Sequence, residues 1–335
     1  MRNCKSAILA AVFVFGILCA CKSKGEDKIF TIQVGDYWNE THPMAAAMDT
    51  VFKAQIEEKT KRKITVIVRH NGQLGSEKEL WDSVRNGTLE VAVVGAPMNN
   101  EWPVKRISDW PFLYRDIDHA KKVWTSSIPN ELNIQFHETF PSVYMLAWGP
   151  NSSRTFTSSK KLTTIKDMAG LTFRVPDNPV HLGIVESLGA SAQVISLGNL
   201  YSALMSGDVD GQDNGMVTVV SQRFYEVQKY LYETNHIIST LEIIINASFM
   251  DSLPVDYKTI VEDAAKAAAL KAWNDYILSF DDDREFLVSK GMIISPCTPE
   301  EQALIVQRAR PMVEKLLTDN VTWAPKLIDR IRAVQ

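Results

Sequence analysis

The hydrophobic and polar positions between residues 29 and 94 alternate between the period of a strand and that of a helix. Residues 29–34 (IFTIQV), 63–68 (KITVIV) and 89–94 (LEVAVV) are predicted strands, and the last is apolar enough for a buried parallel strand. Helices are predicted over 42–59 and 76–85, between these strands. Strands that alternate with helices are typical of an open α/β sheet.

A second cycle of the same kind follows later in the chain. Residues 171–175 and 192–195 are predicted strands, while 179–188 and 198–205 are predicted helices. These elements predict a second α/β lobe. The apolar stretch 237–249 (IISTLEIIINASF) needs cover on both faces, so we expect a strand there that returns to the first lobe.

Helical character then runs from Pro254 to about Ser289 without an internal proline or glycine. A helix of this length would measure about 54 Å at 1.5 Å per residue, so we expect it to cross both lobes. The predicted fold is therefore an α/β fold with two lobes joined by a long helix. The predicted division places 29–149 and 237–280 in lobe I, and 150–236 and 281–335 in lobe II.

The N-terminus has the pattern of an export signal. Two basic residues precede an apolar stretch at 7–18 that is too short to span a bilayer, which predicts a signal peptide over residues 1–20. Residues 18–21 (LCAC) resemble the lipobox of bacterial lipoproteins, so Cys21 is the predicted acylation site. Residues 21–28 are then a lipidated, polar tether. The alternative is a buried N-terminal helix.

Composition and charge restrict the class of protein. The chain has 335 residues, of which 45% are hydrophobic and 23% charged, enough apolar material for two domain cores. A net charge of -4 gives no general electrostatic case for binding nucleic acid. Only Cys297 lies beyond residue 21, so no disulfide is expected within the folded body.

Signatures of catalysis are absent from the sequence. There is no G-x-S-x-G, H-E-x-x-H, G-x-x-x-x-G-K-[ST] or post-strand G-x-G-x-x-G motif. The six histidines are scattered without metal-ligand spacing. We therefore expect no catalytic residue, no metal and no cofactor.

Two arginines are unusual for their context. Arg174 lies within the apolar strand at 171–175, and an unpaired buried guanidinium is very unfavourable. It must be paired or face a cleft, where its planar fork could bind a carboxylate through two hydrogen bonds. Arg154 lies where the second lobe begins. For each arginine, a structural salt bridge to a neighbouring aspartate is the alternative.

A set of ordered segments resembles the extracytoplasmic solute receptors of TRAP (tripartite ATP-independent periplasmic) transporters. Residues 201–214 (YSALMSGDVDGQDN) are similar to the family's Y-x-A-L-x-x-G-x-V-D-G-Q-E-N motif. The other similar segments are 73–77 (QLGSE), 86–92 (NGTLEVA), 111–113 (PFL) and 167–176 (DMAGLTFRVP). Together they cover essentially the whole chain after the export signal, in the family's order.

The resemblance implies specific ligand contacts. It implies that Arg174 binds the carboxylate of a ligand between the lobes, with help from Arg154 and Asn214, and Gln212 of the same motif joins the predicted ligand-binding residues. The chain departs from the family's pattern at Asp213, where glutamate is usual.

First-lobe contacts are predicted from the geometry of α/β sheets. Ligands of open sheets bind at the carboxyl ends of the strands. The loop after the strand at 29–34 carries Tyr37, Trp38 and Asn39, and the loop after the next strand carries Asn71 and Gln73. For Trp38, packing in the core is the alternative.

The function implied is that of a lipid-anchored periplasmic receptor, which is not an enzyme. It would capture a small organic acid and deliver it to the membrane permease subunits of a TRAP transporter. One alternative is a lipoprotein receptor for an apolar or lipid-like ligand, working with a helical-repeat partner. Another is a periplasmic enzyme acting on a carboxylated substrate, which turnover of a bound acid would reveal.

Overall fold

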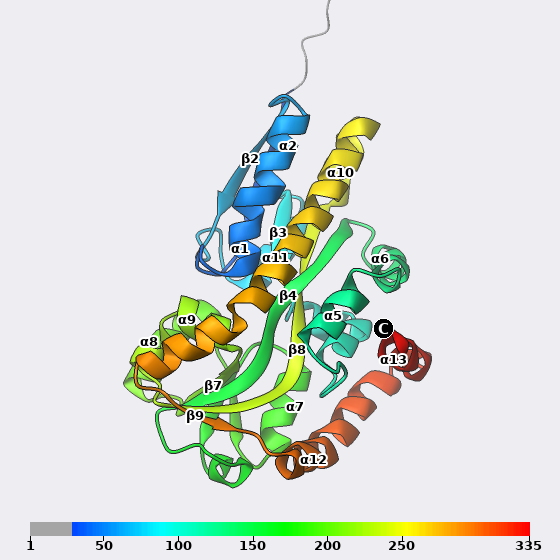
Figure 1. Cartoon of the computed structure of the whole chain (residues 1–335). Helices are drawn as coiled ribbons and strands as arrows, with labels where there is room; N and C mark the ends of the chain where they lie inside the picture. The colour runs from blue at the N-terminus through cyan, green and yellow to red at the C-terminus, as the bar shows by residue number, and fades with distance from the viewer. Residues whose placement is uncertain (1–28) are drawn as a thin grey trace, which may run out of the picture.

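The computed structural model describes residues 29–335, and within that range the strands form one mixed sheet (Figure 1). The predicted signal peptide, the tether and Cys21 lie outside the described residues. The sheet order is β2-β1-β3-β8-β4-β7-β5-β6, and β9 pairs with β8. The strands are β1 (Phe30–Gly35), β2 (Ile64–Arg69), β3 (Val91–Val94), β4 (Val143–Ser158), β5 (Thr172–Val175), β6 (Ser191–Val194), β7 (Gly211–Asn214), β8 (Tyr230–Asn246) and β9 (Ile293–Pro296).

Helices cover this sheet. The α-helices are α1 (Pro43–Ala47), α2 (Ala54–Lys59), α3 (Glu77–Asn86), α4 (Met98–Glu101), α5 (Ile117–Trp124), α6 (Ile128–Thr139), α7 (Pro179–Ser187), α8 (Leu197–Ser206), α9 (Met216–Ser221), α10 (Ala247–Ser252), α11 (Val255–Ser289), α12 (Pro299–Thr318) and α13 (Ala324–Ala333). A π-helical segment, η1 (Met48–Lys53), joins α1 to α2, so the helix predicted over 42–59 is confirmed as a continuous helical run. The 3-10 segments are η2 (Pro103–Asp109), η3 (Ile165–Met168) and η4 (Phe224–Glu226).

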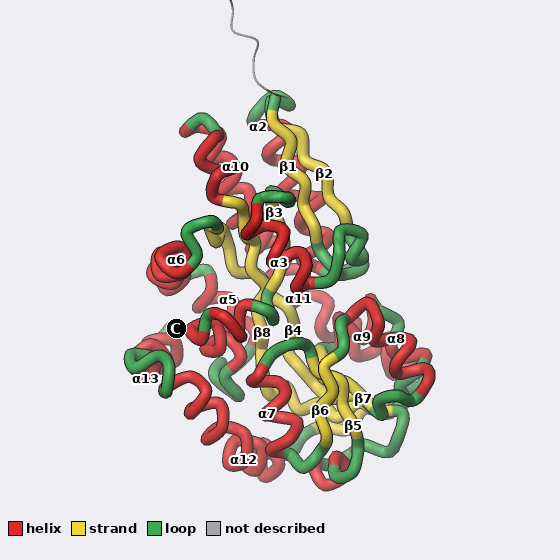
Figure 2. The backbone as a smooth tube through the Cα atoms, turned by 180° about the vertical axis from the view of Figure 1, so that it is seen from behind, coloured by secondary structure: helices red, strands yellow, loops and turns green. Residues whose placement is uncertain are grey.

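Two lobes are joined by a pair of long strands. In lobe I, β1 lies between β2 and β3 and is parallel to both; in lobe II, β5 lies between β6 and β7 in the same way. The antiparallel strands β4 and β8 run from one lobe to the other (Figure 2). The C-terminal end of β8 pairs with β3 in lobe I. The C-terminal end of β4 pairs with β7 in lobe II. The predicted two-lobe α/β fold is confirmed.

Helix α11 crosses both lobes, as predicted (Figure 1). Its N-terminal part buries a row of small side chains, including Ala264 and Ala268, in the core of lobe I. Near its other end, Leu287 is buried in a lobe II core with Leu204 and Phe224. Because one rigid helix belongs to both cores, movement of one lobe relative to the other must bend or displace it.

The C-terminal helices contact both lobes. Helix α12 packs against α7 of lobe II and against η2. In α13, Arg330 forms an ion pair with Glu131 of α6 at 2.6 Å. The division of the chain into 29–149 with 237–280 and 150–236 with 281–335 stays a prediction.

The long strands are where the structure differs most from the sequence pattern. The strand predicted over 237–249 begins at Tyr230 and ends at Asn246, where α10 starts. Strand β4 was not predicted, because three register shifts interrupt its alternation and Pro150 lies in its middle. In the described part of the chain, no helix is long and apolar enough to cross a membrane.

Candidate functional site

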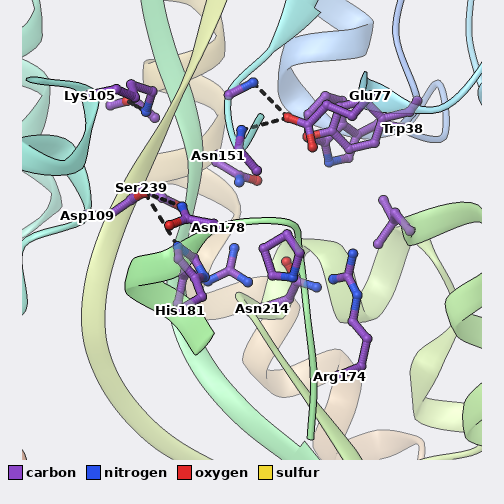
Figure 3. Close-up of a pocket in the computed structure, with 17 residues that line it drawn as sticks. Trp38, Glu77, Lys105, Asp109, Asn151, Arg174, Asn178, His181, Asn214 and Ser239 are labelled. Atoms are coloured by element: carbon purple, nitrogen blue, oxygen red, sulfur yellow. Dashed lines mark hydrogen bonds and ion pairs between the residues drawn. The ribbon is translucent and has the colours of Figure 1, made fainter. Parts of the chain in front are cut away.

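A narrow pocket lies between the two lobes, with a cavity volume of about 30 Å³. Its walls come from loops after β1 and β3 and the start of α3 on one side, and from β5, β7, α7 and the start of α8 on the other (Figure 3). The residues that line it are Tyr37, Trp38, Glu77, Gly95, Ala96, Lys105, Asp109, Asn151, Arg154, Arg174, Pro176, Asn178, His181, Leu197, Asn214, Ser239 and Thr240. The location at strand ends agrees with the general rule for open α/β sheets.

Arg174 projects into this pocket from β5 (Figure 3). It is buried, and its Nε donates a hydrogen bond to the carbonyl oxygen of Ile195 at 2.6 Å. Within residues 29–335 it has no ion-pair partner within 4.0 Å. Burial, followed by the nearby charge of Arg154, lowers the pKa of Arg174 to about 10, so its guanidinium is still protonated at pH 7. An unpaired buried guanidinium that faces a cavity is chemically suited to binding an anion.

Arg154, by contrast, is paired. Its Nε donates to Oδ1 of Asp213 at 2.9 Å, and its Nη2 donates to the carbonyl oxygen of the same residue. Both residues are buried, and Arg154 also lines the pocket. Burial raises the pKa of Asp213. The charge of Arg154 and the hydrogen bond from His181 lower it by more than burial raises it, so the pKa lies well below the ordinary value of an aspartate. Arg154 therefore lines the pocket, but two of its guanidinium nitrogens, Nε and Nη2, already donate to Asp213.

Strand β7, at the end of the 201–214 motif, places Asn214 in the pocket and Gln212 behind it. Nδ2 of Asn214 donates to Oε1 of Gln212 at 2.7 Å, and Nε2 of Gln212 donates to the hydroxyl of Thr157 at 2.8 Å. Gln212 is fully buried and does not line the pocket. It therefore orients the amide of Asn214.

Of the predicted first-lobe residues, Tyr37 and Trp38 line the pocket. Trp38 is also buried in the lobe I core, so it both packs in the core and lines the pocket. Its backbone N–H donates to Oδ1 of Asp36 at 3.1 Å, which fixes the loop after β1.

Asn39 and Gln73 are not brought to the pocket. Oδ1 of Asn39 accepts a hydrogen bond from the backbone N–H of Thr41 at 3.0 Å, in the turn before α1. Gln73 is exposed in the loop after β2. Asn71 lines a neighbouring cavity that shares Tyr37 and Arg174 with the pocket.

Glu77 was missed by the sequence reasoning. It is the first residue of α3, and its Oε1 accepts hydrogen bonds from the backbone N–H groups of Gly95 and Ala96 at 2.7 and 2.9 Å. Burial raises the pKa of Glu77 by more than the hydrogen bonds from Tyr37 and Ala96 lower it, so the pKa lies above the ordinary value of a glutamate. The available clue was its place in the 73–77 segment, directly after a loop at a strand end.

A second missed cluster surrounds Asp109 at the end of η2. Its Oδ2 accepts a hydrogen bond from Nδ2 of Asn178 at 2.8 Å and lies 3.5 Å from Nε2 of His181. Burial raises the pKa of Asp109, but Lys105 and His181 outweigh that effect and bring it to about 2. No clue in the sequence connects these residues, because Asp109 and Asn178 are 69 positions apart in the chain.

No group of three or more His, Cys, Asp or Glu side chains within residues 29–335 is arranged to hold a metal ion. The pocket wall instead carries two guanidinium groups, of which that of Arg174 is unpaired within this range, together with one ammonium, one imidazole, two carboxylates and several amides and hydroxyls. Such a set is chemically suited to binding an anion and to hydrogen-bonding the rest of a polar ligand.

Two α/β lobes around a polar pocket define a two-lobe solute-binding protein. Residues 34–320 match the family described as bacterial extracellular solute-binding protein, family 7 (DctP). The chain belongs to this family, whose members act outside the cytoplasm.

Individual relatives agree with this assignment. A solute-binding protein of Roseobacter denitrificans is 27% identical over 320 residues, which cover 93% of this chain and 97% of that protein. A TRAP periplasmic solute-binding protein of Haemophilus influenzae with bound L-gulonate has a TM-score of 0.86 at 29% identity, covering 91% of this chain and 100% of that one. Another, from Sulfurospirillum deleyianum with bound succinate, has a TM-score of 0.82 at 26% identity, covering 91% and 99%.

Proposed function

We propose that this protein is the receptor of a TRAP-type secondary transporter, and that it binds a small organic acid and delivers it to membrane permease subunits. The observation that carries the proposal is Arg174, a buried guanidinium without an ion-pair partner among residues 29–335, projecting into a pocket between two lobes. Solved members of the family contain bound organic acids, including L-gulonate and succinate.

In this proposal Arg174 takes the ligand carboxylate through its two free Nη groups. Because Nε already donates to the carbonyl oxygen of Ile195, the plane of the guanidinium is fixed before the ligand arrives. Asn214 and the part of Arg154 not used by Asp213 supply further donors. Closure of the lobes excludes water, which strengthens the ion pair.

The charged and amide-rich wall supports a polar ligand over an apolar or lipid-like one. The relatives named above are solute-binding proteins, which supports a receptor that releases its ligand unchanged. A bound acid recovered chemically altered after incubation with the protein would instead support the enzyme alternative.

The test begins with mass spectrometry of small molecules released by denaturing the purified protein. Calorimetric titration then compares the wild type with Arg174→Ala and Arg174→Lys, with Arg223→Ala as a control at an exposed arginine. Leaving one partner of a buried charge pair alone costs about 3–5 kcal/mol, or roughly two to three and a half decades of affinity. Arg174→Lys should also bind weakly, because lysine keeps the charge but loses the fork. Wild-type affinity in a folded Arg174→Ala variant would contradict the proposal.

We also propose that the mature protein is anchored to the membrane through acylated Cys21, since residues 18–21 follow a short apolar stretch. More than one acyl chain would be needed for stable anchoring. Radiolabelled fatty acid should enter the wild type and not Cys21→Ser, and equal labelling of both would contradict the anchor.

A further inference from the structure

A second cavity is separate from the interlobe pocket. It has a volume of about 240 Å³ and is lined by residues of α5, α6, β4 and α11 (Figure 1). Helix α11 contacts both α5 and β4, and none of the residues that line this cavity also lines the interlobe pocket. An apolar cavity of about 150 Å³ is enough to bind benzene. The second cavity is therefore large enough for a small ring system with a polar substituent.

Two stacked tryptophans line this cavity. The ring centroids of Trp124 and Trp148 are 4.4 Å apart, and the ring planes lie 9° from parallel. Nε1 of Trp124 donates to the hydroxyl of Tyr114 at 2.9 Å, and Nε1 of Trp148 donates to Oδ1 of Asn133 at 2.8 Å. Because both indole N–H groups are already used, these two side chains offer a ligand only apolar ring surface.

The remaining apolar part of the wall is incompletely covered by the protein. It consists of Pro129, Leu146, Ala147, Ala269 and Leu270. The side chain of Leu270, on α11, is 43% exposed although it is hydrophobic. An apolar group that enters the cavity and covers this leucine removes apolar surface from water, which favours binding.

The cavity has one charged residue at its wall, Lys266 of α11. The next lysine of this helix, Lys271, is paired with Asp275 one turn later. Lys266 has no ion-pair partner within 4.0 Å among residues 29–335, and this includes Glu262, one turn before it. The residues that line the cavity, all within the described range, include no aspartate or glutamate. The charge at the wall therefore favours an anion over a neutral molecule or a cation.

Asn133 supplies a second donor beside this cation. Its Oδ1 accepts the hydrogen bond from Nε1 of Trp148, which orients the amide. Its Nδ2 has no hydrogen-bond partner within residues 29–335, and the residue lines the cavity. A carboxylate can accept hydrogen bonds from an ammonium and an amide at the same time.

We propose that this cavity is a second ligand site, and that it binds a small aromatic monocarboxylate. The ring packs against Trp124, Trp148 and Leu270, and the carboxylate binds Lys266 and Asn133. The proposal goes beyond the receptor function, which concerns the interlobe pocket, and it does not involve Arg174.

Calorimetry with three naphthalene compounds tests the site and its charge preference. At pH 7, 2-naphthoate is an anion, 2-naphthalenemethanol is neutral and 2-naphthalenemethylamine is a cation, and all three share one ring system. The protein is the folded Arg174→Ala variant, so that a carboxylate cannot bind the guanidinium in the interlobe pocket. We expect 2-naphthoate to bind at least about threefold tighter than the alcohol, and the amine to bind most weakly. Absence of 2-naphthoate binding, or equal affinity for all three compounds, would overturn the proposal.

Variants of the cavity, made in the otherwise wild-type chain, assign the binding to named side chains. Lys266→Gln should weaken 2-naphthoate by about threefold or more and leave 2-naphthalenemethanol unchanged, because only the charge is removed. Lys326→Gln, at an exposed lysine of α13, is the matched control and should change neither. Ala269→Leu places a larger side chain in the cavity and should weaken both compounds by about tenfold or more.

The outcomes separate this site from the interlobe pocket. If Ala269→Leu folds and binds 2-naphthoate like the wild type, the cavity is not the binding site. If Lys266→Gln binds it like the wild type, the ligand is not held by its charge, and the proposed ligand class is wrong. Because Lys266 is exposed, this second comparison remains available even if Ala269→Leu does not fold. Loss of 2-naphthoate binding in Arg174→Ala alone would overturn the second site and leave the receptor proposal intact.

Discussion

The substitution Asp213→Asn tests whether the pocket is built on a buried ion pair. Oδ1 of Asp213 lies 2.9 Å from Nε of Arg154, and Oδ2 lies 3.0 Å from Nδ1 of His181. Nε2 of His236 lies 3.7 Å from Oδ1 of the same carboxylate. Arg154 and Asp213 are 2% and 1% exposed. The variant retains the shape of the side chain but removes the charge that compensates the guanidinium.

The expected effect is large. Removing one partner of a buried ion pair costs about 3–5 kcal/mol, because the other charge stays buried without compensation. The asparagine oxygen can still accept the hydrogen bond from Nε of Arg154, so we expect about 3 kcal/mol, near the lower end of that range. The exposed pair between Arg330 and Glu131 provides the comparison, since exposed pairs contribute about 0–1 kcal/mol.

Urea unfolding followed by circular dichroism at pH 7 measures both changes, with Glu131→Gln as the control. The pH dependence gives a second readout. Because the folded-state pKa of Asp213 lies below its unfolded value of about 3.9, its stabilisation is complete above that value and is lost as the pH falls toward the folded pKa. The variant should lose this part of the acid sensitivity. An unfolding free energy of Asp213→Asn within about 1 kcal/mol of the wild type would refute the reasoning, because a buried pair would then act like an exposed one.

Three further predictions concern the scaffold. A hydrogen bond with Asp36 raises the pKa of His70 to about 9, so its stabilisation should be complete below about pH 6.5 and lost as the pH rises through 9. His70→Gln should remove that alkaline loss in unfolding measurements between pH 6 and 10. Gly211→Ala should destabilise the protein by about 1–3 kcal/mol, since a Cβ there would collide with the backbone oxygen of Thr157, whereas Gly198→Ala meets nothing within 4 Å and should be nearly neutral in the same unfolding assay. Small-angle scattering should show a smaller radius of gyration with saturating ligand, and an unchanged profile would exclude lobe closure.

The sequence alone determined the elements with strong local signals. The helix predicted over 76–85 is α3, and its start at the capping box of Ser76 is a local signal, because the box uses side chains only three residues apart. Helix α11 followed from a long stretch without breakers. Strand β4 escaped prediction, since its bulges and Pro150 destroy the alternation by which a strand is recognised.

The site shows what local pattern could not decide. Arg154 and Arg174 are both buried strand arginines, and the sequence allowed a salt bridge or a ligand for each. Only the sheet order, with β7 between β4 and β5, puts Asp213 against Arg154 and leaves Arg174 facing the pocket. Arg154 and Asp213 are 59 positions apart in the chain. Local periodicity indicates which face of a helix or strand is buried. The partner of a buried charge depends on how distant segments of the chain pack together, so only the tertiary structure determines it.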